Sequence, residues 1–274
     1  MKIAVVGAGI IGSCTAWVAA EQGQDVVLFD EDNAISHTSR SSSKLLHGGL
    51  RYLETGQLAL VKKALRARRF WLERAPHICH KLELLFPIYE KSGRPRWQIG
   101  LGTKLYDLLA MGSGFPTSHW LSKNEVLLRN PQLISDGLIG AYSFYDAQMD
   151  DFALGNWVVE QAQQAGVVLN FNQKIDSLSE LIGFDRIANA TGPWAMSLRQ
   201  QQDGTPAYHI DWVRGSHIFI DQPQPQALML PIPGEKRIFF VLPYQAKTLI
   251  GTTEVRQDHP EADRPSEKEI AYLL

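Results

Sequence analysis

The chain has 274 residues, 45% hydrophobic and 20% charged, a composition typical of a soluble globular protein with a sizeable core. Its formal net charge of −2 excludes a global positive charge that would attract nucleic acid or an anionic membrane. The two cysteines, Cys14 and Cys79, are too few for a disulfide framework and fit a reducing compartment.

The N-terminus predicts a strand–helix–strand unit. Residues 2–6 (KIAVV) indicate a short buried strand, residues 10–22 a helix, and residues 25–30 (DVVLFD) a second buried strand. A signal peptide would place an apolar helix here, but the three glycines between residues 7 and 12 weaken such a helix. We therefore expect the unit to belong to the folded protein.

The turn between the first strand and the helix reads GAGIIG and predicts a dinucleotide site. Gly7 permits the tight turn, Gly9 lets the backbone approach a pyrophosphate, and Gly12 allows close packing of helix on strand. Asp30, eighteen positions after Gly12, is placed to accept hydrogen bonds from ribose hydroxyls. An acid there disfavours NADP, but the fingerprint does not choose between NAD and FAD.

The next segments lead away from that unit. Residues 36–49 predict an ordered loop rich in serine and glycine. Residues 57–75 predict a basic helix whose charged face is solvated, the alternative being contact with a membrane or nucleic acid. The apolar face of this helix carries Leu58, Val61, Leu65 and Leu72. Residues 81–150 change character, with many prolines and aromatic residues, and indicate a second region of short strands and helices.

The second half alternates between helix and strand. Residues 152–165 predict a helix with Asp150 as its N-cap and Asp151 as a first-turn charge, which is a better explanation of this pair than acid–base catalysis. A strand is expected over residues 167–171, and another at residues 185–192 runs into a glycine turn.

Two strand-like segments and a final helix are expected in the remainder of the chain. Residues 208–222 and 236–254 alternate as strands do. The chain ends at residues 267–274 in an amphipathic helix with no cap or stop signal, so we expect it to continue beyond residue 274.

A resemblance to a known family comes from seven runs that occur in order. They are SSSKLLHGGLRYLE (41–54), YDLLA (106–110), MDDFAL (149–154), NATGPWA (189–195), RGSHIFI (214–220), RIFFVLPY (237–244) and LIGTTEV (249–255). Together they resemble the FAD-dependent glycerol-3-phosphate dehydrogenases that pass electrons to quinone. That family lies in the wider class of flavoproteins similar to glycine oxidase and D-amino-acid oxidase.

The resemblance implies an α/β fold in two interwoven domains. A Rossmann-like FAD-binding domain would comprise residues 1–80 and 150–200, and a substrate-capping domain with a mixed or antiparallel sheet residues 81–149 and 201–274. It implies oxidation of sn-glycerol 3-phosphate to dihydroxyacetone phosphate, with electrons passing to quinone. It also implies that FAD contacts come from Gly7, Gly9, Ile11, Gly12, Asp30, Ser42, Ser43, Lys44, His47, Gly48, Gly49, Thr191 and Gly192.

Several of these assignments compete with ordinary structural roles. Lys44 either brings positive charge to the phosphates or reduced flavin, or is a solvated loop lysine. His47 either contacts the flavin or is a buried, hydrogen-bonded histidine. Gly48 and Gly49 would let the chain pass close to a flat ring, as would the turn at Gly192.

The resemblance also implies a substrate site. Arg51 would bind the phosphate, since a guanidinium matches two of its oxygens; the alternative is a structural ion pair. Tyr52 would contact the substrate or close the pocket, or pack in the core. His217 would take the C2 hydroxyl proton, since histidine titrates near neutrality; the alternative is a strand histidine bonded to backbone.

The expected partners follow from the same resemblance. They are glycerol 3-phosphate, a quinone acceptor, peripheral contact with the inner face of the membrane by a cytoplasmic protein, and a homodimer. Separately, the net charge of −2 predicts no nucleic-acid partner, and the scattered histidines and cysteines predict no metal. A related flavin oxidase acting on an amino or hydroxy acid is one alternative. A non-catalytic flavin-binding protein is another.

Overall fold

The computed structural model describes residues 1–90, 93–203, 210–232, 235, 237–261 and 264–274. Packing divides the chain into two compact units. The first comprises Met1–Ser42, Asp150–Val213 and Arg256–Ala262, and the second Ser43–Met149, Arg214–Val255 and Asp263–Leu274. The functional division into an FAD-binding and a substrate domain stays a prediction, because packing does not test which residues serve which ligand.

The first unit is built on a parallel sheet, as the N-terminal strand–helix–strand pattern predicts. Its strands lie in the order β7-β2-β1-β8. They are β1 (Lys2–Val6), β2 (Asp25–Phe29), β7 (Val168–Asn170) and β8 (Arg186–Asn189). The helices are α1 (Ile10–Glu21), α5 (Asp151–Gln164) and α6 (Ala195–Asp203). Helix α1 packs on α5, where the rings of Trp17 and Trp157 meet edge to face at 5.7 Å.

Helix α5 begins as its sequence predicts. The Asp150 side chain accepts a hydrogen bond from the Ala153 N–H, which confirms Asp150 as the N-cap. Asp151 lies in the first turn, where its negative charge interacts favourably with the helix dipole. It is only 4% exposed, which indicates that it also contacts another segment of the chain.

The second unit contains a mixed sheet of eight strands. Seven lie in the order β10-β13-β12-β11-β4-β6-β3, and β5 pairs with β6 at one side of this path. Within the described residues, β11 and β4 pair in parallel, and the other neighbouring strands of this sheet are antiparallel. The strands are β3 (Leu45–Leu46), β4 (Cys79–Tyr89), β5 (His119–Ser122), β6 (Leu138–Met149), β10 (His217–Ile220), β11 (Ala227–Pro231), β12 (Ile238–Tyr244) and β13 (Lys247–Gly251). Strands β9 (Trp212–Arg214) and β14 (Val255–Gln257) pair separately.

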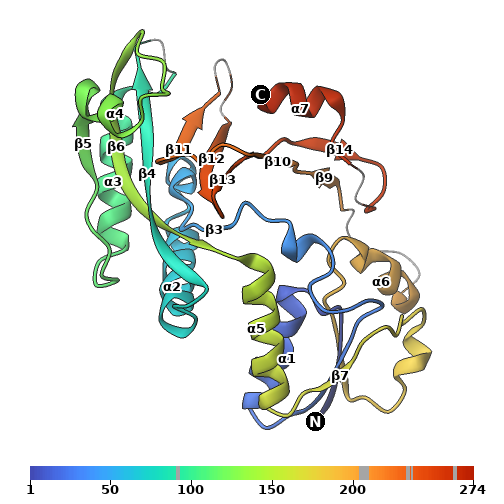
Figure 1. Ribbon diagram of the computed structural model, residues 1–274. Helices are drawn as coiled ribbons and strands as arrows, with labels where there is room; N and C mark the ends of the chain where they lie inside the picture. Colours follow the sequence, from blue (N-terminus) through green and yellow to red (C-terminus); the bar gives the residue numbers. More distant parts are fainter. Residues whose placement is uncertain (91–92, 204–209, 233–234, 236, 262–263) are drawn as a thin grey trace. The chain divides into compact units, whose positions relative to one another are not determined.

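Both faces of the long β4 strand are covered. Leu84, Phe86 and Ile88 point into the larger apolar core, while Leu85 between them belongs to a second cluster on the opposite face. Helices α2 (Leu58–Arg74) and α3 (Arg96–Leu109) contribute to the larger core, and α4 (Lys123–Arg129) contributes to the second cluster. Helix α7 (Glu267–Leu273) ends the chain (Figure 1). No helix of the described residues is long and apolar enough to cross a membrane.

Helix α2 departs from its predicted faces at two residues, Leu58 on the apolar face and Arg68 on the basic face. Val61 and Leu65 are buried as expected, and Leu58 is exposed, but Arg68 is also buried, with 2% of its surface exposed. Helical spacing cannot reveal this, because Arg68 is drawn inward by a carboxylate that comes from β6, far away in the sequence.

The C-terminal helix α7 has a cap that the sequence analysis missed. Ser266 and Glu269 form a capping box, in which each side chain bonds the backbone N–H of the other. Glu269 is 5% exposed and also accepts hydrogen bonds from Arg214 at 2.6 Å and from the hydroxyls of Ser216 and Thr253, each at 2.9 Å. The cluster ties α7 to the segment that leads into β10.

Acid should loosen this attachment. Burial alone would raise the Glu269 pKa, but hydrogen bonds from the Ser266 backbone, Arg214, Ser216 and Thr253 outweigh it and lower the pKa from 4.5 to about 2. A carboxylate whose pKa is lower in the folded state stabilises the fold fully above pH 4.5 and loses that contribution as the pH falls toward 2.

We therefore expect Glu269→Gln to lower the free energy of unfolding at pH 7 on the order of 2 kcal/mol and by progressively less as the pH falls through that range. Urea unfolding at a series of pH values measures both effects. A variant that loses as much stability at pH 2.5 as at pH 7 would contradict the assignment.

Candidate functional site

The glycines of the GAGIIG turn are required by the space around them. Gly7 has φ +102°, and a Cβ there would lie 2.5 Å from the Ala190 carbonyl oxygen. A Cβ on Gly12 would lie 1.8 Å from the Gly7 carbonyl oxygen. Because backbone atoms make these contacts, no side-chain movement could relieve them. The absence of a Cβ at both positions is what allows helix α1 to start directly against the end of β1.

The first turn of α1 offers backbone donors. Gly9 is the N-cap without a side-chain hydrogen bond, and the Ile10 N–H is taken by Ser39 Oγ at 3.0 Å. Among the described residues, the N–H groups of Ile11 and Gly12 have no acceptor. Free donors at the positive end of a helix suit the pyrophosphate of a dinucleotide, so this turn fits the group that the fingerprint predicts.

Asp30 and the turn after β8 lie beside the glycine turn within the same unit. Asp30 follows β2, and its two carboxylate oxygens accept the N–H groups of Ala8 at 2.5 Å and Asp32 at 3.0 Å. Thr191 donates its hydroxyl to Asn189 Oδ1 at 2.7 Å, and Gly192 has φ +57°. These bonds hold the acid and the turn at the carboxyl ends of β2 and β8, the two parallel strands that flank β1, and dinucleotide sites form at such strand ends.

The buried Asp151 carboxylate binds Ser42 through two hydrogen bonds. The backbone N–H and the hydroxyl of Ser42 both donate to Asp151 Oδ2, at 2.9 and 2.8 Å. The sequence analysis assigned Ser42 to the cofactor and Asp151 to the helix dipole, and missed that the buried acid holds the serine loop in place. Only the fold brings these two residues together, since they lie 109 positions apart.

The second unit carries the rest of the serine- and glycine-rich loop. Ser43 Oγ lies 2.9 Å from His217 Nε2 on β10, and the Lys44 ammonium lies 5.8 Å from the centre of the Tyr244 ring. A Cβ on Gly251, the partner of His217 on β13, would lie 2.2 Å from the imidazole. The Ser43 hydroxyl thus holds the His217 ring, which packs against Gly251 at a distance that leaves no room for a side chain there.

Two of the alternatives for this loop are excluded. His47 is exposed, so it is not a buried histidine held by the core. Tyr52 is 37% exposed, so it is not a core residue; its ring covers Gly49, where a Cβ would lie 2.3 Å from the ring. The roles of His47 and Tyr52 toward ligands stay predictions.

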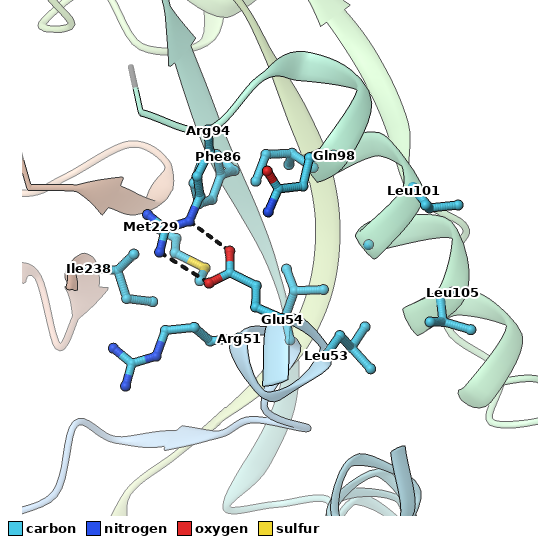
Figure 2. Close-up of a pocket in the computed structure, with 13 residues that line it drawn as sticks. Arg51, Leu53, Glu54, Phe86, Arg94, Gln98, Leu101, Leu105, Met229 and Ile238 are labelled. Atoms are coloured by element: carbon cyan, nitrogen blue, oxygen red, sulfur yellow. Dashed lines mark hydrogen bonds and ion pairs between the residues drawn. The ribbon is translucent and has the colours of Figure 1, made fainter. Parts of the chain in front are cut away.

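Arg51 lines a cavity of about 230 Å³ within the second unit. Within the described residues it makes no hydrogen bond or ion pair, which argues against a purely structural ion pair. Arg94 on the same cavity is bound through two nitrogens to Glu54, at 2.7 and 3.2 Å. Figure 2 shows the Arg51 side chain directed away from that pair. The cavity walls are mostly apolar: Leu50, Leu53, Phe86, Ile99, Leu101, Leu105, Met229 and Ile238.

One group of possible metal ligands lies in the first unit, although the sequence spacing indicates none. Glu31, Asp32 and His37 are all exposed and close together, and His37 Nε2 lies 2.9 Å from Asp32 Oδ2. Exposed acidic groups are common without an ion, and His37 also packs on the Trp194 ring at 5.1 Å. We assign no metal to this group.

The parallel sheet, the glycine turn against a helix N-terminus and the acid after β2 define a dinucleotide-binding protein of the α/β class. Residues 2–274 match the model of the FAD-dependent oxidoreductase (DAO) family, and the chain belongs to that family. This confirms the α/β fold with a mixed sheet, FAD as the cofactor, and the oxidoreductase class. The fingerprint alone had left NAD and FAD open.

The relatives carry the names that the resemblance predicts. The chain is 32% identical to human mitochondrial glycerol-3-phosphate dehydrogenase, over 99% of this chain and 42% of that protein. It is 29% identical to the alpha-glycerophosphate oxidase of Streptococcus pyogenes, over 100% of this chain and 50% of that protein. The chain thus spans about half the length of the curated relatives it matches.

A solved structure supports the fold. The chain is similar to glycerol-3-phosphate dehydrogenase from Bacillus halodurans, solved with FAD, with a TM-score of 0.75 and 23% identity. The match covers 100% of this chain and 51% of that one. At this identity the likeness supports the architecture alone.

Proposed function

We propose that the protein oxidises sn-glycerol 3-phosphate to dihydroxyacetone phosphate and passes the electrons to a quinone. The relatives named for this substrate support the proposal, as does an arginine that binds no partner within the described part of the chain. The unpartnered Arg51 is the observation on which the substrate assignment depends, because an unpaired guanidinium suits an oxyanion supplied by a ligand.

Arg51 would bind the substrate phosphate. A phosphate monoester carries close to two negative charges at neutral pH, and a planar guanidinium bonds two of its oxygens at once. Glu54, the nearest acid along the same short helix, is neutralised by Arg94 and so would not compete for Arg51. Tyr52, beside Arg51 and partly exposed, is available to contact the same ligand.

His217 would accept the proton of the C2 hydroxyl. Its imidazole is held by Ser43 Oγ at Nε2 and by close contact with Gly251, so its orientation does not have to be found on binding. FAD, when bound, supplies the acceptor for the hydride from C2. The proton on His217 and the hydride on the cofactor together account for the two hydrogens and two electrons that the alcohol loses.

The acceptor and location are further parts of the proposal. A quinone acceptor implies contact with a membrane, and we propose peripheral attachment of a cytoplasmic protein to the inner face, and a homodimer. The exposed lysines and arginines of α2, which include Lys62, Lys63 and Arg66, offer positive charge for such contact. Association with anionic vesicles and analytical ultracentrifugation test the two points separately.

A related flavin oxidase is the second candidate. Arg51 would suit a carboxylate as well as a phosphate. For the glycerol 3-phosphate reaction itself, the name of the Streptococcus pyogenes relative, alpha-glycerophosphate oxidase, makes oxygen the alternative acceptor to quinone. A non-catalytic flavin-binding protein is the remaining alternative.

Anaerobic reduction of the bound flavin separates these functions. We expect glycerol 3-phosphate to bleach the flavin absorbance, and glycine and 2-hydroxyglutarate to leave it unchanged. A soluble quinone should then restore the absorbance faster than oxygen does. Bleaching by glycine or 2-hydroxyglutarate alone would favour the second candidate, and a flavin that no substrate reduces would favour a non-catalytic protein.

A further inference from the structure

A buried cluster in the second unit converges on one backbone N–H of the loop that carries His47 and Arg51. The Gly48 N–H lies 2.8 Å from the Tyr106 hydroxyl and 3.0 Å from Asp146 Oδ1. Tyr106 donates to the same Asp146 oxygen at 2.6 Å, and so does Arg68, also at 2.6 Å. Three elements distant in the sequence, α2, α3 and β6, thus meet at one peptide group.

We propose that Arg68, Asp146 and Tyr106 form a positioning cluster that fixes the backbone of residues 47–51 and thereby places Arg51 for its ligand. The catalytic part of this inference rests on the proposed function. The placement of the loop does not, and it can be measured in the protein without substrate.

The cluster is buried, so its charges contribute little net stability but define the geometry of their neighbours. Arg68, Asp146 and Tyr106 are 2%, 4% and 1% exposed. A buried ion pair gives little net stability, because removing both charges from water cancels much of their attraction. Its defined geometry does specify one arrangement of the groups bonded to it. Here that group is the Gly48 N–H, which has two acceptors.

Arg68 is held in the cluster by one nitrogen and by an aromatic ring, while its Nε and Nη2 are buried without a hydrogen-bond partner within the described residues. The Arg68 guanidinium lies 3.9 Å from the centre of the Phe115 ring and also donates to the Tyr145 carbonyl at 2.9 Å. Burial and the neighbouring Asp146 charge raise the Tyr106 pKa well above 10. Its hydroxyl therefore stays protonated at any working pH, donates to Asp146 and remains an acceptor for Gly48.

The loop itself is shaped to lie on this cluster. A Cβ on Gly48 would lie 2.3 Å from both Leu65 Cδ2 and the Tyr106 hydroxyl, so only glycine lets the backbone come this close. Gly49 follows with φ +76°, and the short helix Leu50–Thr55 that carries Arg51 begins directly after it. A shift of Gly48 would therefore move Arg51, three residues away.

Tyr106→Phe tests the inference with little change of shape. It removes the hydroxyl and keeps the ring, which packs edge to face on Phe144. We expect amide hydrogen exchange of a peptide spanning residues 45–52 to become about tenfold faster in the substrate-free protein. Tyr142→Phe is the matched control, because the Tyr142 hydroxyl has no hydrogen bond within the described residues, and exchange at 45–52 should stay unchanged.

Enzyme kinetics then test whether the cluster acts through Arg51. Tyr106→Phe should raise the KM for glycerol 3-phosphate about tenfold and change kcat less. In an Arg51→Ala background the same substitution should change kcat/KM by less than about twofold, because the group being positioned is gone. Asp146→Asn, which keeps the side-chain size, should accelerate exchange at 45–52 at least as much as Tyr106→Phe.

Two results would overturn the proposal. One is exchange at 45–52 that rises no more in Tyr106→Phe than in Tyr142→Phe. The other is a full, additive effect of Tyr106→Phe when Arg51 is absent. If the parent protein fails to oxidise glycerol 3-phosphate, the proposed function fails, but the exchange experiment still decides whether the cluster positions the loop.

Discussion

Replacing Arg51 with alanine is expected to raise the KM for glycerol 3-phosphate roughly 30- to 100-fold, which corresponds to a loss of about 2–3 kcal/mol for a charge-assisted bond. No ion pair of Arg51 within the described residues is broken by the change, so the loss should come from the ligand and not from the fold. Steady-state kinetics with a quinone analogue measure KM and kcat, and thermal unfolding should be unchanged.

Arg51→Lys is the conservative variant for the same site. It keeps the charge but loses the planar pair of donors, so its KM should fall between those of the parent and Arg51→Ala. Arg129→Ala is the matched control, because Arg129 pairs with Glu83 at 2.9 Å and lies outside the cavity; its KM should equal that of the parent. An Arg51→Ala enzyme with unchanged KM would show that another group binds the phosphate.

A change at His217 should have a different kinetic signature. His217→Gln should lower kcat more than it raises KM, because the imidazole is assigned to proton transfer and Arg51 to binding. Equal effects of the two variants on KM would remove the distinction between the roles that we propose for them.

The sequence predicts the first unit well because its signals are local. Gly7, Gly12 and Asp30 lie within one strand–helix–strand segment, so their spacing already contains the geometry that the structure has. The Asp150 cap is equally local, three residues from the N–H that it accepts. Such patterns need no knowledge of tertiary packing.

The parts that the sequence analysis missed depend on contacts between distant segments. From its sequence position alone, Arg68 is one more charge on a basic helix; the fold places Asp146, 78 residues away, beside it. Asp151 holding Ser42 is a similar case. Tyr106 lay in a run that supported the family resemblance, yet nothing in that run indicates that its hydroxyl meets the Gly48 backbone. Helical and strand periodicities describe single elements and cannot specify these pairings.

Gly12→Ala is expected to abolish FAD binding and to lower the free energy of unfolding by about 3 kcal/mol or more. The added Cβ would lie 1.8 Å from the Gly7 carbonyl oxygen and 3.2 Å from Ala190 Cβ. The clash with Gly7 is with backbone, so α1 must move away from the end of β1. The N–H groups of Ile11 and Gly12 would then no longer converge on a pyrophosphate.

The flavin absorbance of the purified variant and its thermal unfolding measure the two effects. Gly102→Ala is the matched control, since Gly102 also lies inside a helix, α3, but has open space where its Cβ would be. That change should leave flavin content unchanged and stabilise the protein by about 0.5–1 kcal/mol, because alanine favours helix over glycine. A Gly12→Ala protein that retains full flavin would mean that the cofactor does not depend on this turn, and the first unit would need another explanation.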